Sequence, residues 1–137
     1  MINSETIVLD GIEIFELGAD DIDDQHYQFA AIVDNIHCSD KQSFPQLFTR
    51  LCEHVAAHFE YENSLMEKHE FPAKAEHSSE HLRVLGELVQ LNRQVEKGRP
   101  MMAQAYVKER LPEWFSLHLA TMDSALVAHL KKSGVVK

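Results

Sequence analysis

The 137-residue sequence is poor in the residues that form turns, with only 5 glycines and 4 prolines. This scarcity argues against a β-sandwich or a barrel, because their many short strands need many tight turns. Hydrophobic residues make up 45% of the chain, which is enough for the core of one domain of this length. We therefore expect a single, helical domain over residues 1–137.

Positive charge and long apolar runs are also scarce. The chain has 13 Lys and Arg against 22 Asp and Glu, a formal net charge of −9, which argues against nucleic acid or an anionic membrane as the main partner. No stretch approaches the roughly 18 consecutive apolar residues of a membrane span. The opening residues, MINSETIVLDG, have neither the basic nor the apolar segment of a signal peptide. We expect no membrane insertion and a cytoplasmic location.

Cysteine is limited to Cys38 and Cys52, and their spacing is not that of a CxxC motif. A helical protein of this size uses such residues mainly as small hydrophobic side chains. We therefore expect both to be buried.

Apolar residues recur at helical spacing in four segments. The first begins near Asp20 with an acidic first turn, the second follows Ser43, the third ends before Gly98, and the fourth runs towards Lys132. Their short connections predict an all-α fold, an up-down-up-down antiparallel four-helix bundle. We expect an extended N-terminal arm over residues 1–18, the bundle over 19–132 and a tail over 133–137. The segment IEIFELG could form a strand, but it has no evident partner strand, and Pro112 predicts a kink or a restart in the last helix.

Side chains that can bind metals interrupt all four apolar stripes. HFEYE and HSSEH each place two such side chains at i and i+4, on one face of a helix. Burying five imidazoles and two carboxylates without partners would cost several kcal/mol, and metal ions would remove that cost. Seven ligands are too many for one tetrahedral zinc and suit two octahedral ions that share carboxylates. The candidate ligands are His26, His58, Glu62, His77, His81, His118 and Asp123.

The last pair, His118 and Asp123 in HLATMD, has an unusual spacing of five residues. Side chains at that spacing diverge by roughly 140° around an ideal helix. With two ions, the two side chains need not point to the same place, because one side chain can reach one ion while the other bridges the pair. A local i→i+5 turn would bring them closer still, and such π-helical turns are frequent at functional sites.

The ordered array H…HxxxE…HxxxH…HxxxxD resembles the hemerythrin family, particularly the bacterial hemerythrins. LGADDIDDQH resembles the opening motif of the family, HFEYENSLMEKHEFPAKAEHSSEH its central block and WFSLHLATMD its closing block. The similarity covers about residues 11 to 130. It implies a non-haem di-iron centre, bridged by an oxo or hydroxo group, that binds O2 reversibly and is not an enzyme.

The resemblance also implies a role for each candidate ligand. His77, His81 and His118 would hold one iron, and His26 and His58 would hold the other, which keeps an open position for O2. Glu62 and Asp123 would bridge the two ions. An apolar lining would protect bound oxygen from water, and the candidates for it are Phe59, Trp114, Phe115 and Leu119. His54 forms a further HxxxH with His58, but we expect it to lie outside the ligand set.

Three functions fit such a centre: reversible O2 binding for storage, transport or delivery; sensing of O2, redox state or nitric oxide; and di-iron oxidase, peroxidase or iron-handling activity. Ferritin-like di-iron sites use four Glu and two His with ExxH motifs, and the required positions here lack them. The histidine-rich set therefore favours O2 binding. The chain departs from the family pattern at Gly11, where an aromatic residue is common, and at Pro112.

Overall fold

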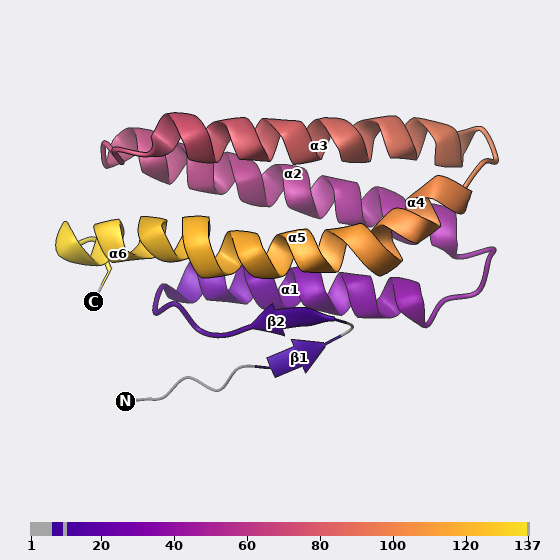
Figure 1. The fold of residues 1–137 in the computed structure, drawn as a ribbon, viewed down its shortest axis with the longest axis horizontal. Helices are drawn as coiled ribbons and strands as arrows, with labels where there is room; N and C mark the ends of the chain where they lie inside the picture. The colour runs from indigo at the N-terminus through magenta and orange to yellow at the C-terminus, as the bar shows by residue number, and fades with distance from the viewer. Residues whose placement is uncertain (1–6, 10, 137) are drawn as a thin grey trace.

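The computed structural model describes residues 7–9 and 11–136, so that parts of the predicted arm and tail, residues 1–6, 10 and 137, lie outside the described residues. Four helical rods lie side by side and alternate in direction (Figure 1), which confirms the predicted bundle. The rods are α1 (Asp20–His37), α2 (Phe44–Lys68), α3 (Lys74–Glu96) and a last rod that consists of α4 (Met101–Ala105), η1 (Tyr106–Arg110), α5 (Leu111–His118), η2 (Leu119–Asp123) and α6 (Ser124–Lys132). No helix in the described part of the chain has the length and apolar character needed to cross a membrane.

The N-terminal arm contains a β-hairpin, so the expectation that its strand-like segment lacks a partner was wrong. Strand β1 (Ile7–Leu9) pairs antiparallel with β2 (Ile12–Ile14), and the turn between them passes through Gly11 at φ +81°. The partner strand directly precedes the segment in sequence, and glycine permits the left-handed turn that joins them. The side chains of Ile12 and Ile14 are buried, and Figure 1 shows the hairpin against the bundle.

The hairpin packs against α5, the helical segment that carries His118. The Glu13 backbone N–H donates a hydrogen bond to Ser116 Oγ at 2.9 Å. A Cβ atom built on Gly11 would lie 3.6 Å from Pro112 Cβ. The two positions that depart from the family pattern are therefore neighbours in the fold.

A kink or a restart was predicted at Pro112, and the structure instead shows a continuous rod that changes from a π-helical turn to α5 at Leu111. Directly before the proline, the Leu111 N–H bonds to the carbonyl of Tyr106, five residues earlier, and the rod forms the π-helical turn η1. Proline has no N–H to donate, and its ring crowds the carbonyl four residues before it. The wider π turn accommodates both effects, and α5 continues along the bundle axis.

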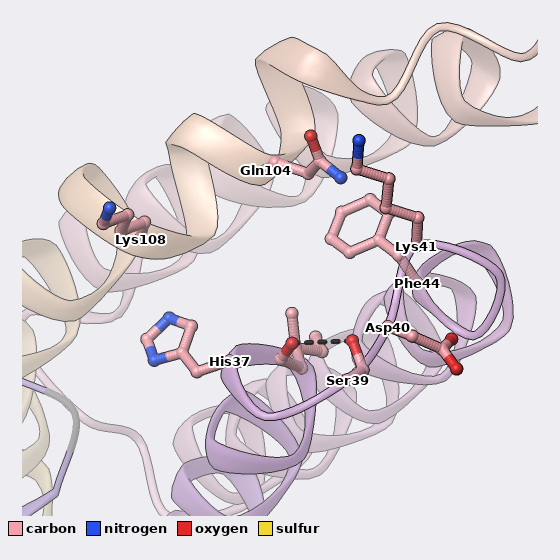
Figure 2. A pocket seen from close by; sticks show the side chains of 8 residues that line it. His37, Ser39, Asp40, Lys41, Phe44, Gln104 and Lys108 are labelled. Carbon is pink, nitrogen blue, oxygen red and sulfur yellow. Dashed lines mark hydrogen bonds between the residues drawn. The ribbon is translucent and has the colours of Figure 1, made fainter.

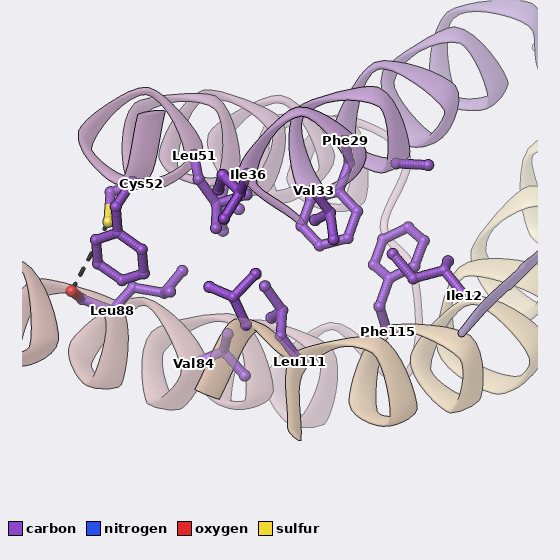
Figure 3. Packing of buried hydrophobic residues seen from close by; sticks show 14 of the residues in the cluster. Ile12, Phe29, Val33, Ile36, Leu51, Cys52, Val84, Leu88, Leu111 and Phe115 are labelled. Carbon is purple, nitrogen blue, oxygen red and sulfur yellow. Dashed lines mark hydrogen bonds between the residues drawn. The ribbon is translucent and has the colours of Figure 1, made fainter. Parts of the chain in front are cut away.

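The apolar core has two parts, which lie on opposite sides of the polar candidate residues along α1, α2 and the last rod. The larger part includes Phe29, Val33, Leu51, Leu88 and Leu111 (Figure 3). The smaller part, at the other end, includes Ile22, Met66, Leu126 and Leu130. Burial of these side chains stabilises the bundle on both sides of the polar layer.

The two cysteines differ in their surroundings. Cys52 is buried, as predicted, and burial raises the pKa of its thiol to about 12. Cys38 is exposed at the C-terminal end of α1, so the prediction that both are buried was wrong for it. Helix ends lie at the surface, and the position of a cysteine at such an end decides its exposure more than its residue type.

Candidate metal centre

All seven candidate ligands meet in one layer of the bundle interior. His26 comes from α1, His58 and Glu62 from α2, His77 and His81 from α3, His118 from α5, and Asp123 from η2. Each is buried, and His58 is the most exposed of them at 6%. The i,i+4 pairs of α2 and α3 point their side chains inward together, as the spacing predicts.

The Glu62 carboxylate divides its two oxygens between two groups of histidines. Its Oε2 lies 3.2 Å from His58 Nε2 and 3.9 Å from His26 Nε2. Its Oε1 lies 3.1 Å from His81 Nε2 and 3.4 Å from His77 Nε2. One oxygen therefore faces the histidines of α1 and α2, and the other faces those of α3.

The Asp123 carboxylate divides its oxygens in the same way. Its Oδ2 lies 3.0 Å from His26 Nε2, whereas its Oδ1 lies 3.1 Å from both His77 Nε2 and His118 Nε2. The donor atoms thus form two groups that share Glu62 and Asp123, and within each group they all lie within 4.8 Å of one another. One group adds two histidines to the shared carboxylates, and the other adds three.

Of the four carboxylate oxygens in the layer, Asp123 Oδ1 has a hydrogen-bond partner, His77 Nε2 at 3.1 Å, and the other three have none. Among the described residues, eight buried side-chain nitrogen or oxygen atoms have no hydrogen-bond partner, and all belong to candidate ligands. His26 Nε2 is one of them although Asp123 Oδ2 is only 3.0 Å away. Two like atoms, His77 Nε2 and His118 Nε2, face each other at 3.3 Å. Donors that crowd together with so few hydrogen bonds fit a cation placed between them, because imidazole and carboxylate lone pairs then share it.

The electrostatics of the layer keep both carboxylates ionised. Burial alone raises the pKa of Asp123, but its contacts with His118, His26 and His77 outweigh burial and hold it well below the usual value. The pKa of Glu62 is also lowered, because its histidine contacts, His58 foremost, outweigh burial and the repulsion from Asp123. Burial lowers the pKa of His77, but the two carboxylates raise it to about 9. The layer therefore carries two buried anionic groups that stabilise positive charge between them.

A π-helical turn brings His118 and Asp123 together, as predicted from their spacing. In η2 the Ser124 N–H bonds to the carbonyl of Leu119, five residues earlier. The Ser124 hydroxyl also donates to this carbonyl at 2.9 Å. The extra residue in the turn rotates Asp123 towards the side of His118, so that both reach the layer.

Three of the four predicted lining residues contact histidine rings of the layer. Phe59 stacks on His81, with ring centroids 3.9 Å apart and planes inclined by 7°. Trp114 stacks on His118 at 4.5 Å and 21°. Phe115 meets His26 edge-on at 5.4 Å, and Leu119 is fully buried in the adjoining core. These contacts enclose the ring faces in apolar surface and keep bulk water away from them.

Two side-chain amides beside the layer were missed by the sequence analysis. Gln25 Oε1 accepts a hydrogen bond from His58 Nδ1, and Asn63 Oδ1 accepts one from His81 Nδ1 at 3.0 Å. Only their adjacency in sequence to His26 and Glu62 could have drawn attention to them. His54 belongs to neither donor group, as expected, and its Nε2 donates to the backbone carbonyl of Gln25 at 3.1 Å.

A surface pocket between the C-terminal end of α1 and α4 has a volume of about 410 Å³ (Figure 2). His37, Lys41, Phe44, Gln104 and Lys108 line it, and within it Ser39 Oγ donates to the carbonyl of Ile36. None of the seven candidate ligands takes part in its lining. The pocket is therefore separate from the candidate metal centre.

Comparison with known proteins gives consistent matches to one family. The family model described as hemerythrin HHE cation binding domain matches residues 17–130. A curated bacteriohemerythrin from Ralstonia nicotianae is 28% identical over 127 residues, which cover 93% of this chain and 92% of that protein. Two crystal structures of hemerythrin mutants, each with a leucine replaced, superpose with a TM-score of 0.73 at 21% identity, covering 83% of this chain and 89% of theirs. At that identity the structural likeness shows the fold.

Proposed function

Because the chain belongs to the hemerythrin family, we propose that its buried layer holds two non-haem iron ions and binds O2 reversibly. The observation that carries the proposal is the division of Glu62 and Asp123 between two groups of histidines. A carboxylate with one oxygen towards each group is suited to bridge two ions. His26 and His58 would hold one iron, and His77, His81 and His118 the other.

The two donor groups differ in their number of protein ligands, and this difference favours the binding of a small ligand at one ion. The group with His26 and His58 offers four protein ligands, whereas the group with three histidines offers five. An ion in the smaller group therefore has more room in an octahedral shell for O2. The bound iron would supply the electrons that O2 takes up and later returns.

The surrounding side chains would protect this chemistry from water. We propose that Phe59, Trp114, Phe115 and Leu119 line the space beside the ions. Their apolar surface would disfavour protons and water near bound oxygen, whose release as O2 depends on their exclusion. Reversible binding for storage, transport or delivery is therefore proposed in preference to enzymatic turnover, and a cytoplasmic location stays a prediction.

Oxygen cycling tests the proposal. The iron-loaded protein is reduced under argon, exposed to O2 and returned to argon while its near-ultraviolet and visible absorption is recorded. We expect a bridge-to-iron absorption that appears with O2 and disappears on its removal over repeated cycles. Irreversible oxidation at the first exposure would contradict the proposal and favour a sensor or an oxidase.

A pair of variants on one helix controls for unspecific effects. Glu62→Gln removes a proposed bridging carboxylate, whereas Glu60→Gln makes the same chemical change at an exposed position of α2. We expect the Glu62 variant to lose the reversible signal and the Glu60 variant to keep it. If both variants keep the signal, or both lose it, the signal does not depend on the Glu62 carboxylate, and the proposal is contradicted.

A further inference from the structure

Two histidines of the centre, one in each donor group, form a hydrogen bond from Nδ1, the ring nitrogen on the side away from the layer, to a side-chain amide. The Nδ1–H of His58 donates to Gln25 Oε1. The Nδ1–H of His81 donates to Asn63 Oδ1 at 3.0 Å. In contrast, the Nδ1 atoms of His26, His77 and His118 have no hydrogen-bond partner.

We propose that Gln25 and Asn63 are positioning residues, each of which fixes the tautomer and the ring direction of one metal-binding histidine. An amide oxygen can only accept, so it requires the proton of its histidine on Nδ1. The lone pair of Nε2 then faces the layer, where Glu62 lies 3.2 Å from His58 and 3.1 Å from His81. This inference rests on the proposed two-metal centre and assigns one positioning residue to each ion.

The backbone of Gln25 and the side-chain amide of Asn63 each accept a further hydrogen bond. The backbone carbonyl of Gln25 accepts a hydrogen bond from His54 Nε2 at 3.1 Å, which ties this residue to the helix that carries His58. Asn63 Oδ1 accepts a second hydrogen bond, from Ser78 Oγ at 3.2 Å. Ser78 lies on α3, the helix of His81, so the amide is fixed from the same element as the ring it holds.

The neutral character of the amides also matters. A carboxylate in their place would draw the Nδ1 proton towards itself and make the imidazole a stronger donor to the metal. A neutral acceptor leaves the ring a weaker donor. Gln25 therefore sets the ligand strength of His58 in the four-ligand group, where the proposed function places O2.

Cobalt binding tests the positioning role without O2. The apo protein is titrated with Co²⁺ under argon, and visible absorption reports each ion; we expect the wild type to bind two per chain. Loss of a hydrogen-bonding partner behind a ligand typically weakens metal binding about 10–100-fold. We therefore expect Gln25→Leu to weaken one of the two ions by that factor, and Asn63→Leu to weaken the other.

Two further variants act as controls. Gln28→Leu makes the same change at an exposed position on α1 and should bind both ions as the wild type does. Gln25→Glu retains an acceptor and should restore tight binding. In the zinc-loaded protein, ¹⁵N NMR should show the Nδ1–H of His58 losing its protection from solvent exchange in Gln25→Leu alone.

Wild-type affinity for both ions in Gln25→Leu, or an equal loss in Gln28→Leu, would overturn the positioning role. A selective loss in Gln25→Leu without reversible O2 binding by the wild type would leave that role standing and refute the proposed function.

Discussion

Removal of the metal ions should cost the protein several kcal/mol of stability. Among the described residues, five buried atoms that face the layer have no hydrogen-bond partner: His26 Nε2, His81 Nε2, both oxygens of Glu62 and Asp123 Oδ2. One such atom costs about 1–3 kcal/mol when it is left unsatisfied. Five of them would together cost about 5–15 kcal/mol, as much as keeps a whole domain folded. The metal-free protein must therefore admit water and protons into the layer or lose structure there.

The size of the effect can be bounded from the same atoms. If water satisfies all but two of them, the remaining penalty is about 2–6 kcal/mol. At roughly 4 °C per kcal/mol for a chain of this length, the melting temperature should fall by about 8–24 °C. Differential scanning calorimetry of iron-loaded and chelator-stripped protein measures this difference, and reloading with iron should reverse it.

The location of the loss gives a second measure. Hydrogen exchange should accelerate most in η2, whose π turn carries Asp123, because the ions no longer hold its side chain in the layer. The larger apolar part of the core, around Leu51 and Leu88, should keep its protection longer. A stripped protein that melts within about 2 °C of the loaded one would refute the reasoning, since the buried donors would then need no metal.

Other predictions concern single side chains outside the ligand set. Leu119→Ala should lower the free energy of unfolding by about 2–5 kcal/mol through the cavity it leaves. The same variant should speed irreversible oxidation of the iron-loaded protein. An unchanged oxidation rate would exclude a shielding role for Leu119. Cys38 should react with a thiol reagent in the folded state and Cys52 only on unfolding, because burial raises the pKa of Cys52 to about 12; equal rates would contradict this assignment. Burial and the hydrogen bond to Glu87 raise the pKa of Tyr106, so the stability it contributes is full below the unfolded value near 10 and is lost as pH rises through and above that value. Denaturant unfolding from about pH 8 to pH 11 should therefore show a steeper loss in the wild type than in Tyr106→Phe, and parallel curves would contradict it.

The sequence predicted the bundle and the convergence of the seven candidate ligands because both depend on helical periodicity. His58 with Glu62 and His77 with His81 repeat at i,i+4, and this spacing alone places each pair on one face. The five-residue spacing of His118 and Asp123 led to the prediction of a π turn, which η2 confirms. The division of each carboxylate between two groups was expected from the family resemblance alone. Residue spacing does not predict it, because it depends on how four helices are rotated about their axes.

The features that sequence analysis missed arise from contacts between distant segments. The strand β1 was missed because a hairpin of three-residue strands is stabilised by the bundle beneath it more than by its own pattern. Gln25 and Asn63 have no periodic relation to the rings that they hold, and only the packing of α1, α2 and α3 shows their role. The π turn η1 before Pro112 was anticipated only as a kink or restart, because several local geometries accommodate a proline.

X-ray absorption spectroscopy at the iron edge, combined with metal analysis, tests the two-metal centre most directly. The proposed bridging by Glu62 and Asp123 predicts two iron ions per chain and an iron–iron distance of no more than about 4 Å, as in other two-metal sites. Asp123→Asn protein that holds a single ion should show no iron neighbour at this distance. One iron per chain in the fully loaded wild type, with no second iron in its surroundings, would contradict the account.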